Sequence, residues 1–178
     1  IKPMFRHAFR KSRVLVPADA FYEWKTVEGR KQPWLIHMRD ESPFGMAGLL
    51  EHWAGPAGEI KTFALLTTSP NPLMAEIHDR MPVIIKPEDY ARWLDPTLTD
   101  VEELQAMIGP YPERFMEAYP VSRKVSNPKN DGPDLIEPLD SRQQLAGWLR
   151  HPHFKNSSGD TPSATRIHGG RSVQGRSS

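Results

Sequence analysis

The sequence RVLVPADAFYEWK, residues 13–25, sets the pattern on which the expected fold rests. It begins with β-branched and apolar residues, breaks at Pro-Ala-Asp, and resumes as an aromatic run. Short apolar runs bounded by turn-forming residues predict strands. The pattern recurs in QPWLIHMRD (32–40), FGMAGLLEHWA (44–54) and IKTFALLTT (60–68), and GPAGE (55–59) has the composition of a turn. Together these segments predict a β-meander.

Helical patterns flank this meander, and two more strand patterns follow it. The expected helices cover residues 1–13, 73–77, 86–94, 99–109 and 141–150. The best defined is 99–109, where Thr99 and Glu102 have capping-box spacing and Gly109 ends the helix before a proline. Residues 80–85 and 114–122 predict strands. The chain therefore predicts many short elements and not a helix bundle.

The apolar side chains of these elements supply the expected core. In the helix over residues 86–94, the side expected to be buried carries Tyr90, Trp93 and Leu94. Four tryptophans, Trp24, Trp34, Trp53 and Trp93, are expected mainly as core residues, because that is the commoner role of a tryptophan. Trp24 also has a second reading, as a base-stacking residue, because it adjoins Glu23.

Composition excludes several classes of protein. The formal net charge is +1, so whole-chain charge neither favours nor excludes a nucleic-acid partner. The absence of cysteine excludes disulfides, thiolate metal sites and a cysteine nucleophile among these 178 residues. No window approaches the ~20 apolar residues of a membrane span, and we expect a cytoplasmic protein. Residues 1–150 predict one domain, and the Ser-, Gly- and Arg-rich residues 151–178 predict a disordered tail.

Motifs of common metal and cofactor sites are missing. The sequence has no HExxH, no P-loop, no GxGxxG and no GxSxG elbow. His151 and His153 have a chelating spacing but lie in the expected tail. Ser122 and Lys124 have the composition of a Ser-Lys dyad, but polar residues two apart on a strand usually form a solvated face. We therefore expect no metal and no cofactor.

Glu23 is the first candidate for chemistry. On a strand, alternation places Phe21 and Glu23 on one face, and Tyr22 and Trp24 on the other. A carboxylate held among apolar groups tends to have a raised pKa, which suits proton transfer. The alternative is an edge strand with Glu23 in water.

His78 and Arg80 form the second candidate, within AEIHDRMPVII, residues 75–85. If this segment is extended, the two side chains point the same way and Asp79 points opposite. An imidazole exchanges protons near neutral pH, and a guanidinium holds a phosphate through paired hydrogen bonds. The alternative is a loop in which His78 caps a helix end and Arg80 pairs with an acidic residue.

The basic side chains of the N-terminal helix are a third candidate. Arg6, Arg10 and Arg13 follow helical spacings of four and three. They have the charge to contact a phosphate backbone. Basic residues at this spacing more commonly form a helix face that is simply exposed to solvent.

Five stretches closely resemble one known family, in its order and spacing. They are VPADAFYEWK (16–25), ALLTTSPN (64–71), IHDRMPVII (77–85), ARWLDP (91–96) and YPVSRKVSNPKNDGPDLIEPL (119–139). The family is SRAP, the SOS-response-associated peptidase-like proteins that process abasic sites, and the resemblance covers residues 3–139.

The resemblance implies a fold and an activity. The expected fold is α+β, with a mixed or antiparallel barrel-like sheet flanked by short helices, in a monomer. The expected activity is binding of single-stranded DNA that carries an abasic site, followed by a covalent DNA–protein crosslink through an N-terminal cysteine, at the bacterial nucleoid. Glu23 and His78 match the catalytic residues that assist proton transfer. The positions that match DNA contacts are Trp24, Thr67 and Arg80.

The sequence also departs from the family. Members begin with Met-Cys-Gly-Arg and later carry an NARAE-like segment, and neither is present here. We expect a sequence truncated ahead of Ile1, which alone does not form the crosslink. Two other functions stay open, a non-catalytic module that binds single-stranded DNA and a peptidase.

Overall fold

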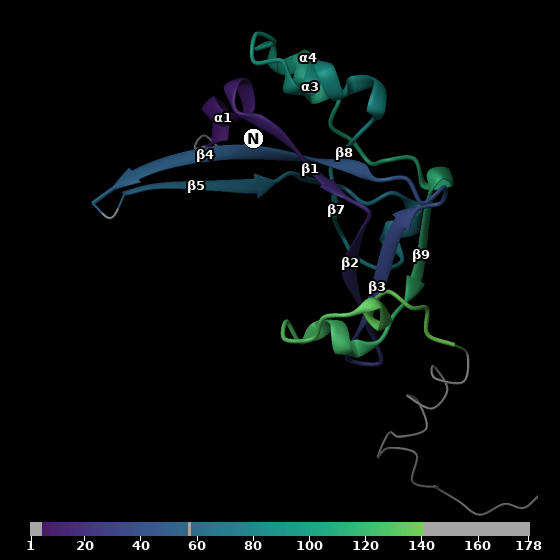
Figure 1. Cartoon of the computed structure of the whole chain (residues 1–178). Helices are drawn as coiled ribbons and strands as arrows, with labels where there is room; N and C mark the ends of the chain where they lie inside the picture. Colours follow the sequence, from purple (N-terminus) through teal and green to yellow (C-terminus); the bar gives the residue numbers. More distant parts are fainter. Residues whose placement is uncertain (1–4, 57, 141–178) are drawn as a thin grey trace, which may run out of the picture. The chain divides into compact units, whose positions relative to one another are not determined.

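Consecutive strands form two of the expected hairpins (Figure 1). The computed structural model describes residues 5–56 and 58–140. Strand β2 (Ala20–Val27) pairs with β3 (Arg30–Met38), and β4 (Phe44–Gly55) pairs with β5 (Gly58–Leu65), both antiparallel. The β2–β3 turn places Glu28 and Gly29 at φ values of 49° and 75°. Two consecutive positive φ values are typical of a type I′ turn, whose twist matches that of the strands.

The simple meander is nevertheless wrong, because the hairpins belong to different sheets. Strand β1 (Arg13–Ala18) pairs with β4 and not with β2, so the chain changes sheet at Asp19. One sheet has the order β1-β4-β5, with β8 (Ile84–Ile85) also on β4, and a second has the order β2-β3-β9. Strand β9 covers Met116–Pro120, and β6 (Thr67–Thr68) pairs with β7 (Met81–Pro82) in a third sheet. Across the described ranges these pairings do not close into one barrel, so the expected barrel-like sheet is not seen there.

The helices are short. They are α1 (Arg6–Lys11), α2 (Pro72–Ala75), α3 (Tyr90–Leu94, after a 3₁₀ turn at Pro87–Asp89) and α4 (Val101–Ala106). The cap of α4 differs from the prediction, because the Asp100 carboxylate, and not Thr99, accepts the N–H of Glu103. None of the described helices is long and apolar enough to cross a membrane. The helix expected at 141–150 and the tail expected from 151 lie outside the described residues.

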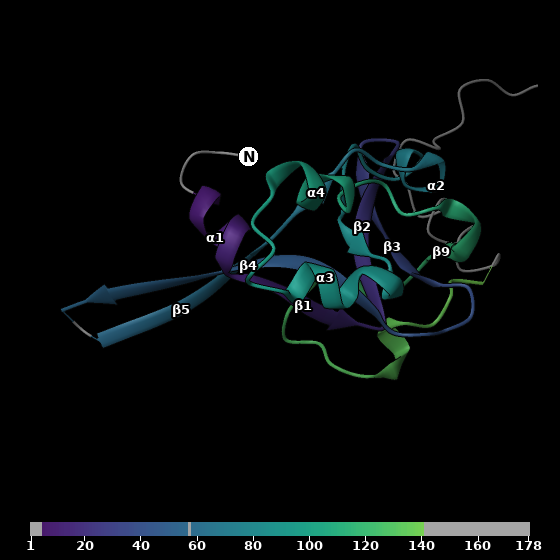
Figure 2. The same cartoon turned by 90° about the horizontal axis from the view of Figure 1, so that it is seen from above.

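Two apolar clusters hold these elements together. The first joins α1, the β1-β4-β5 sheet, α3 and α4 through buried side chains that include Phe9, Leu49, Ile85, Trp93 and Leu104. Figure 2 shows these helices beside strands β1 and β4. The second joins the β2-β3-β9 sheet to α2 and β7 through Ile36, Met74, Met81 and Met116, among others. This second cluster also contains Phe44 and Met46 of β4 and Ile84 of β8, so it connects the two sheets.

Not every expected core residue is buried. Trp93 is fully buried, but the side chain of Leu94 is 47% exposed, because α3 is only five residues long. Trp53 is 54% exposed on the β4–β5 hairpin, which extends beyond the helices in Figure 2. Ile60 and Phe63 are also exposed on β5. The hairpin therefore presents apolar surface that no described element covers.

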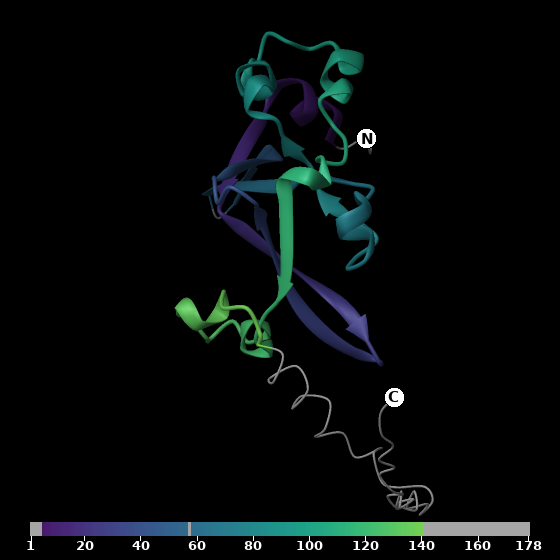
Figure 3. The ribbon, with the colours of Figure 1, turned by 90° about the vertical axis from the view of Figure 1, so that its right-hand side faces the viewer.

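Residues 121–140 pack against the β2-β3-β9 sheet (Figure 3). They contain the 3₁₀ turns Arg123–Ser126 and Pro133–Leu135. The hydroxyl of Tyr22 donates to the carbonyl of Leu135 at 3.3 Å, and that of Tyr119 donates to the carbonyl of Ile136 at 2.9 Å. The face of β2 that carries Tyr22 is therefore covered, whereas the face that carries Glu23 meets α2.

Candidate functional site

Strand β2 places Glu23 at the margin of the second core cluster. Pairing with β3 sets Glu23 directly opposite Trp34, and Phe21 opposite Ile36. Directly opposite residues in an antiparallel pair share a face of the sheet. Phe21 and Trp34 pack against the buried cluster, while the Glu23 side chain remains 26% exposed. Its carboxylate thus lies between core and solvent.

Asn71 fixes the position of α2 opposite this strand. It is buried, and its side-chain oxygen accepts the N–H of Met74 at 2.8 Å, as a helix cap does. Its amide nitrogen donates to the carbonyl of Tyr111 at 2.7 Å. Pro72 at the first helical position adds a preset φ. Because Met74 and Ile77 are themselves core residues, the helix end that leads to His78 is held firmly.

His78 leaves this helix end toward Glu23. Its N–H donates to the carbonyl of Met74 at 2.8 Å, so the backbone is anchored. The imidazole Nε2 lies 3.9 Å from the Glu23 Oε2, and the His78 side chain is 37% exposed. This separation is too long for a direct hydrogen bond. It leaves both groups free to bond to a ligand atom between or above them.

The other imidazole nitrogen of His78 has two neighbours. The backbone N–H of Arg80 donates to Nδ1 at 3.2 Å, and the Asp79 Oδ1 lies 3.1 Å from the same nitrogen. The expectation that Asp79 points away from His78 is wrong, because residues 76–80 form turns and bends and not a strand. When Nδ1 accepts from Arg80, the proton of the neutral ring is on Nε2 and faces Glu23. When the ring is protonated, Nδ1–H turns to Asp79, so both charge states have partners.

A second pair of residues joins the same two elements. Lys25 Nζ lies 3.9 Å from the Glu76 Oε2. The Lys25 ammonium also lies 5.8 Å from the centre of the Trp34 ring. The buried indole Nε1 of Trp34 has no hydrogen-bond partner within the described ranges. Sequence reasoning missed Lys25 and Glu76, although their positions two residues from Glu23 and from His78 were the available signal.

Thr67 and Arg80 lie in adjacent segments. Thr67 pairs with Pro82 in the β6–β7 sheet, which places the chain around Thr67 beside the chain that follows Arg80. Both residues are exposed. The guanidinium of Arg80 has no ion pair or hydrogen bond to any residue that the structure describes. The two residues thus present a hydroxyl on β6 and an unpaired positive charge on the residue that precedes β7.

Trp24 is not brought to Glu23 and His78. It points to the opposite face of β2, where its Nε1 donates to the Ser126 hydroxyl at 3.0 Å. The reason is the two-residue period of the strand, which the sequence already indicated. Trp24 therefore lies with residues 121–140, on the other side of the sheet from Glu23.

The remaining candidates are used elsewhere. The Ser122 hydroxyl accepts the N–H of Lys124, whose ammonium pairs with Asp134 at 2.9 Å, so these two residues form no dyad with each other. Among the described residues, no three His, Cys, Asp or Glu side chains are arranged to hold a metal ion. His151 and His153 lie outside those residues.

The geometry defines a class of site. A partly exposed carboxylate and an imidazole face each other across 3.9 Å, and Arg80, whose guanidinium is unpaired among the described residues, lies two residues after His78. The carboxylate and the imidazole can transfer protons to and from a substrate, and the guanidinium can bind an anionic part of that substrate.

Comparisons with known proteins identify the family. The family model for SOS response associated peptidase (SRAP) matches residues 1–128, and the chain belongs to this family. It is 46% identical over 138 residues to the abasic site processing protein YoqW of Bacillus subtilis, covering 76% of this chain and 62% of that protein. It is 31% identical over 137 residues to the abasic site processing protein YedK of Escherichia coli, again covering 76% and 62%. A crystal structure of a protein from Bacteroides thetaiotaomicron superposes with a TM-score of 0.72 at 32% identity, covering 78% of this chain and 61% of that one. The chain thus spans somewhat under two thirds of the length of these relatives.

Proposed function

We propose that this chain is the part of an abasic-site processing protein that binds single-stranded DNA and moves protons at the abasic sugar. The observation that carries the proposal is the approach of Glu23 to His78 from segments far apart in sequence. The names of the relatives support the choice of an abasic site as the substrate.

The proposed chemistry is ring opening of the abasic sugar. A closed abasic sugar is a hemiacetal, and it opens when its C1 hydroxyl loses a proton and its ring oxygen gains one. A base and an acid that face one sugar carbon can perform both transfers. One residue gains the proton that the hydroxyl loses and the other gives a proton to the ring oxygen, so the number of protons on the two residues together is unchanged. His78 and Glu23 are the two groups, because their Nε2 and Oε2 atoms face each other at 3.9 Å, are not hydrogen-bonded to each other, and belong to partly exposed side chains. The product is an aldehyde, the form that an amine attacks.

Arg80 and Thr67 would hold the phosphates that flank the sugar. A guanidinium binds two phosphate oxygens at once, and a threonine hydroxyl donates one further hydrogen bond. Trp24, on the other face of β2, would contact the strand only where it passes the edge of that sheet.

The test supplies the thiol that the family uses, because none of the 178 residues is a cysteine. A family N-terminal segment that starts with Met-Cys-Gly-Arg is fused ahead of Ile1, and the fusion is incubated with single-stranded DNA carrying one abasic site. His78→Ala and Glu23→Gln are each expected to slow crosslink formation by about 10²–10⁴-fold, the usual range for loss of a general acid or base. His52→Ala is the matched control, since His52 pairs with Glu59 on the exposed β4–β5 hairpin. Crosslinking at the parent rate in both site variants would sink the assignment.

A second function, binding without chemistry, is favoured by the unpaired guanidinium of Arg80. It predicts that the chain binds intact and abasic strands equally, and that Arg80→Ala weakens both to the same degree. Fluorescence anisotropy with two strands that differ only at the abasic position separates the two functions.

A further inference from the structure

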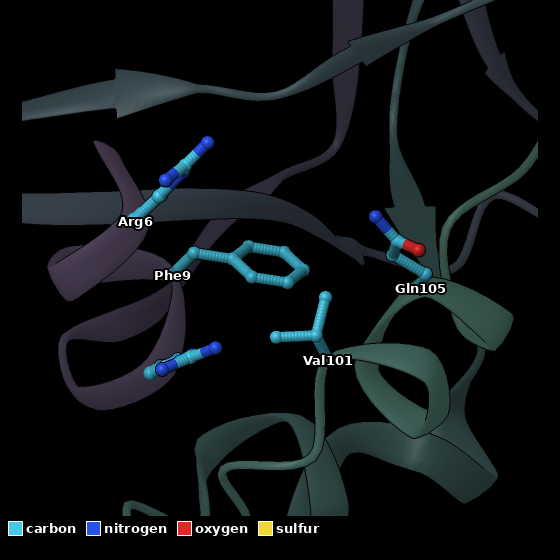
Figure 4. A pocket seen from close by; sticks show the side chains of 5 residues that line it. Arg6, Phe9, Val101 and Gln105 are labelled. Atoms are coloured by element: carbon cyan, nitrogen blue, oxygen red, sulfur yellow. The ribbon is translucent and has the colours of Figure 1, made fainter. Parts of the chain in front are cut away.

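A pocket outside the Glu23–His78 site lies between helices α1 and α4. It is lined by Arg6, Phe9 and Arg10 from α1 and by Val101 and Gln105 from α4, and it has a volume of about 280 Å³ (Figure 4). None of these residues belongs to the site described above. An inference drawn from the pocket therefore stands apart from the proposed function.

The floor of this pocket is apolar and part of the core. Phe9 is 1% exposed and packs edge-to-face on Trp93, with 6.1 Å between the ring centres. Val101 packs against the same cluster. In Figure 4 the Phe9 ring and the Val101 side chain face each other. Because both are held by the core, the pocket has a fixed wall against which a flat or apolar group can rest.

The rim of the pocket carries two unneutralised positive charges. Arg6 and Arg10 lie four residues apart, and thus on one face of α1, and both are exposed. Neither guanidinium is hydrogen-bonded or ion-paired to another residue in 5–56 or 58–140. Arg13, expected from the sequence to extend this row, is instead buried in β1. The basic row that contacts solvent is therefore reduced to the two arginines of the pocket.

The acidic side chains of α4 do not cancel this charge. The Glu103 carboxylate lies 2.6 Å from an Arg92 guanidinium nitrogen, so it is engaged on another face of the helix. Glu102 does not line the pocket. The polar group that α4 contributes is the amide of Gln105, which both donates and accepts hydrogen bonds.

We propose that this pocket binds the phosphate of a nucleotide-sized ligand. The two guanidiniums take the phosphate oxygens, the Gln105 amide bonds to a further polar atom, and the apolar floor receives the sugar or base. A volume of about 280 Å³ suits one nucleotide and not a longer ligand held entirely inside. The nucleotide is either free or one unit of a DNA strand, and the two sources share the same chemistry.

The experiment uses the full 178-residue chain and three probes: inorganic phosphate, thymidine monophosphate and an unmodified fluorescent single-stranded decamer. The double variant Arg6→Gln with Arg10→Gln is expected to weaken binding of thymidine monophosphate by about tenfold or more, since charge-assisted hydrogen bonds are lost. Gln105→Glu keeps the size of the side chain, adds a negative charge, and should weaken binding to a similar degree. Arg114→Gln is the control, because Arg114 is exposed and stacks on Phe115 away from the pocket. Thermal melts of all variants should match the parent, because the substituted side chains lie at the rim.

The decamer separates the two sources of the nucleotide. If the pocket holds a unit of the strand, the slope of log K against log salt falls by about 0.7 in the double variant, because one phosphate contact with the single strand is lost. If the slope is unchanged while the monophosphate is lost, the ligand is a free nucleotide. Two results overturn the proposal: no binding of any probe to the parent chain, or affinities in the pocket variants equal to those of Arg114→Gln.

Discussion

Two polar clusters in this protein each join segments that are distant in sequence, and they differ in how fully their groups are paired. The first, here the anchor cluster, consists of Arg13, Trp93 and Asp95. Arg13 is 7% exposed, and its guanidinium donates to the carbonyls of Phe9, Trp93, Asp95 and Leu98. It also stacks over the Trp93 ring at 5.7 Å. Burial lowers the pKa of Arg13, and the Asp95 carboxylate opposes that change; an arginine nevertheless stays charged near neutral pH.

The second, here the site cluster, consists of Glu23, His78 and Arg80. Its acidic and imidazole groups remain 3.9 Å apart and partly exposed, and the Arg80 guanidinium is exposed. The difference teaches how to separate structure from function among polar residues. A buried charge whose nitrogens are all hydrogen-bonded within the protein has little capacity left for a ligand, whereas groups that meet without pairing keep that capacity.

The largest expected effect comes from removing the anchor. Arg13→Ala should lower the free energy of unfolding by about 3–5 kcal/mol, because four carbonyl oxygens lose a charged donor and a cavity is left. Urea denaturation of the full chain measures the loss. Arg80→Ala is the matched control from the site cluster and should change the same quantity by less than about 0.5 kcal/mol. Equal losses of unfolding free energy in the two variants would show that the two clusters do not differ in their structural role.

An intermediate effect is expected from the tryptophans of the two regions. Trp93→Phe should cost about 2–3 kcal/mol, because Trp93 is fully buried and its Nε1 donates to the carbonyl of Val14 at 3.0 Å. Trp34→Phe should cost less than about 1 kcal/mol, because the indole N–H of Trp34 makes no hydrogen bond among the described residues that the substitution would break. Thermal or urea unfolding of the pair, under one set of conditions, checks the order. A larger loss at Trp34 would indicate that its N–H has a partner in solution.

The smallest effect concerns pH. Hydrogen bonds from the hydroxyl and the N–H of Thr97 lower the pKa of Asp95, and the N–H of Leu98 and the charge of Arg13 add to this. Because the folded-state pKa lies below the unfolded value of about 4, the stabilisation is present above that pH and is lost as the pH falls further. Asp95→Asn keeps an acceptor oxygen but not the charge, so its unfolding midpoint should depend less on pH below about 4. If the unfolding midpoints of the two proteins fell equally as the pH is lowered below about 4, Asp95 would not contribute to the pH dependence of stability.

Much of the local structure follows from the sequence. The two hairpins, the four described helices and the strand within 114–122 lie within a few residues of their expected positions, because alternation and turn residues act over short distances. The errors also have local causes. Helix α4 begins at Val101, so its cap is Asp100, and the bend after α2 turns Asp79 toward His78. Glu23 and His78 were recognisable as candidates from residue chemistry and the family motifs.

The sequence by itself determined which residues can carry acid–base chemistry and which segments form strands, since both depend on side-chain type and on neighbours a few positions away. Only the tertiary structure decided that β1 joins β4, that Arg13 is buried, and that the Trp24 indole donates to the Ser126 hydroxyl. It also decided that the Glu23 carboxylate and the His78 imidazole meet. These outcomes depend on contacts between segments tens of residues apart. The energies of those contacts come from packing two apolar clusters, and they leave no periodic pattern in the sequence.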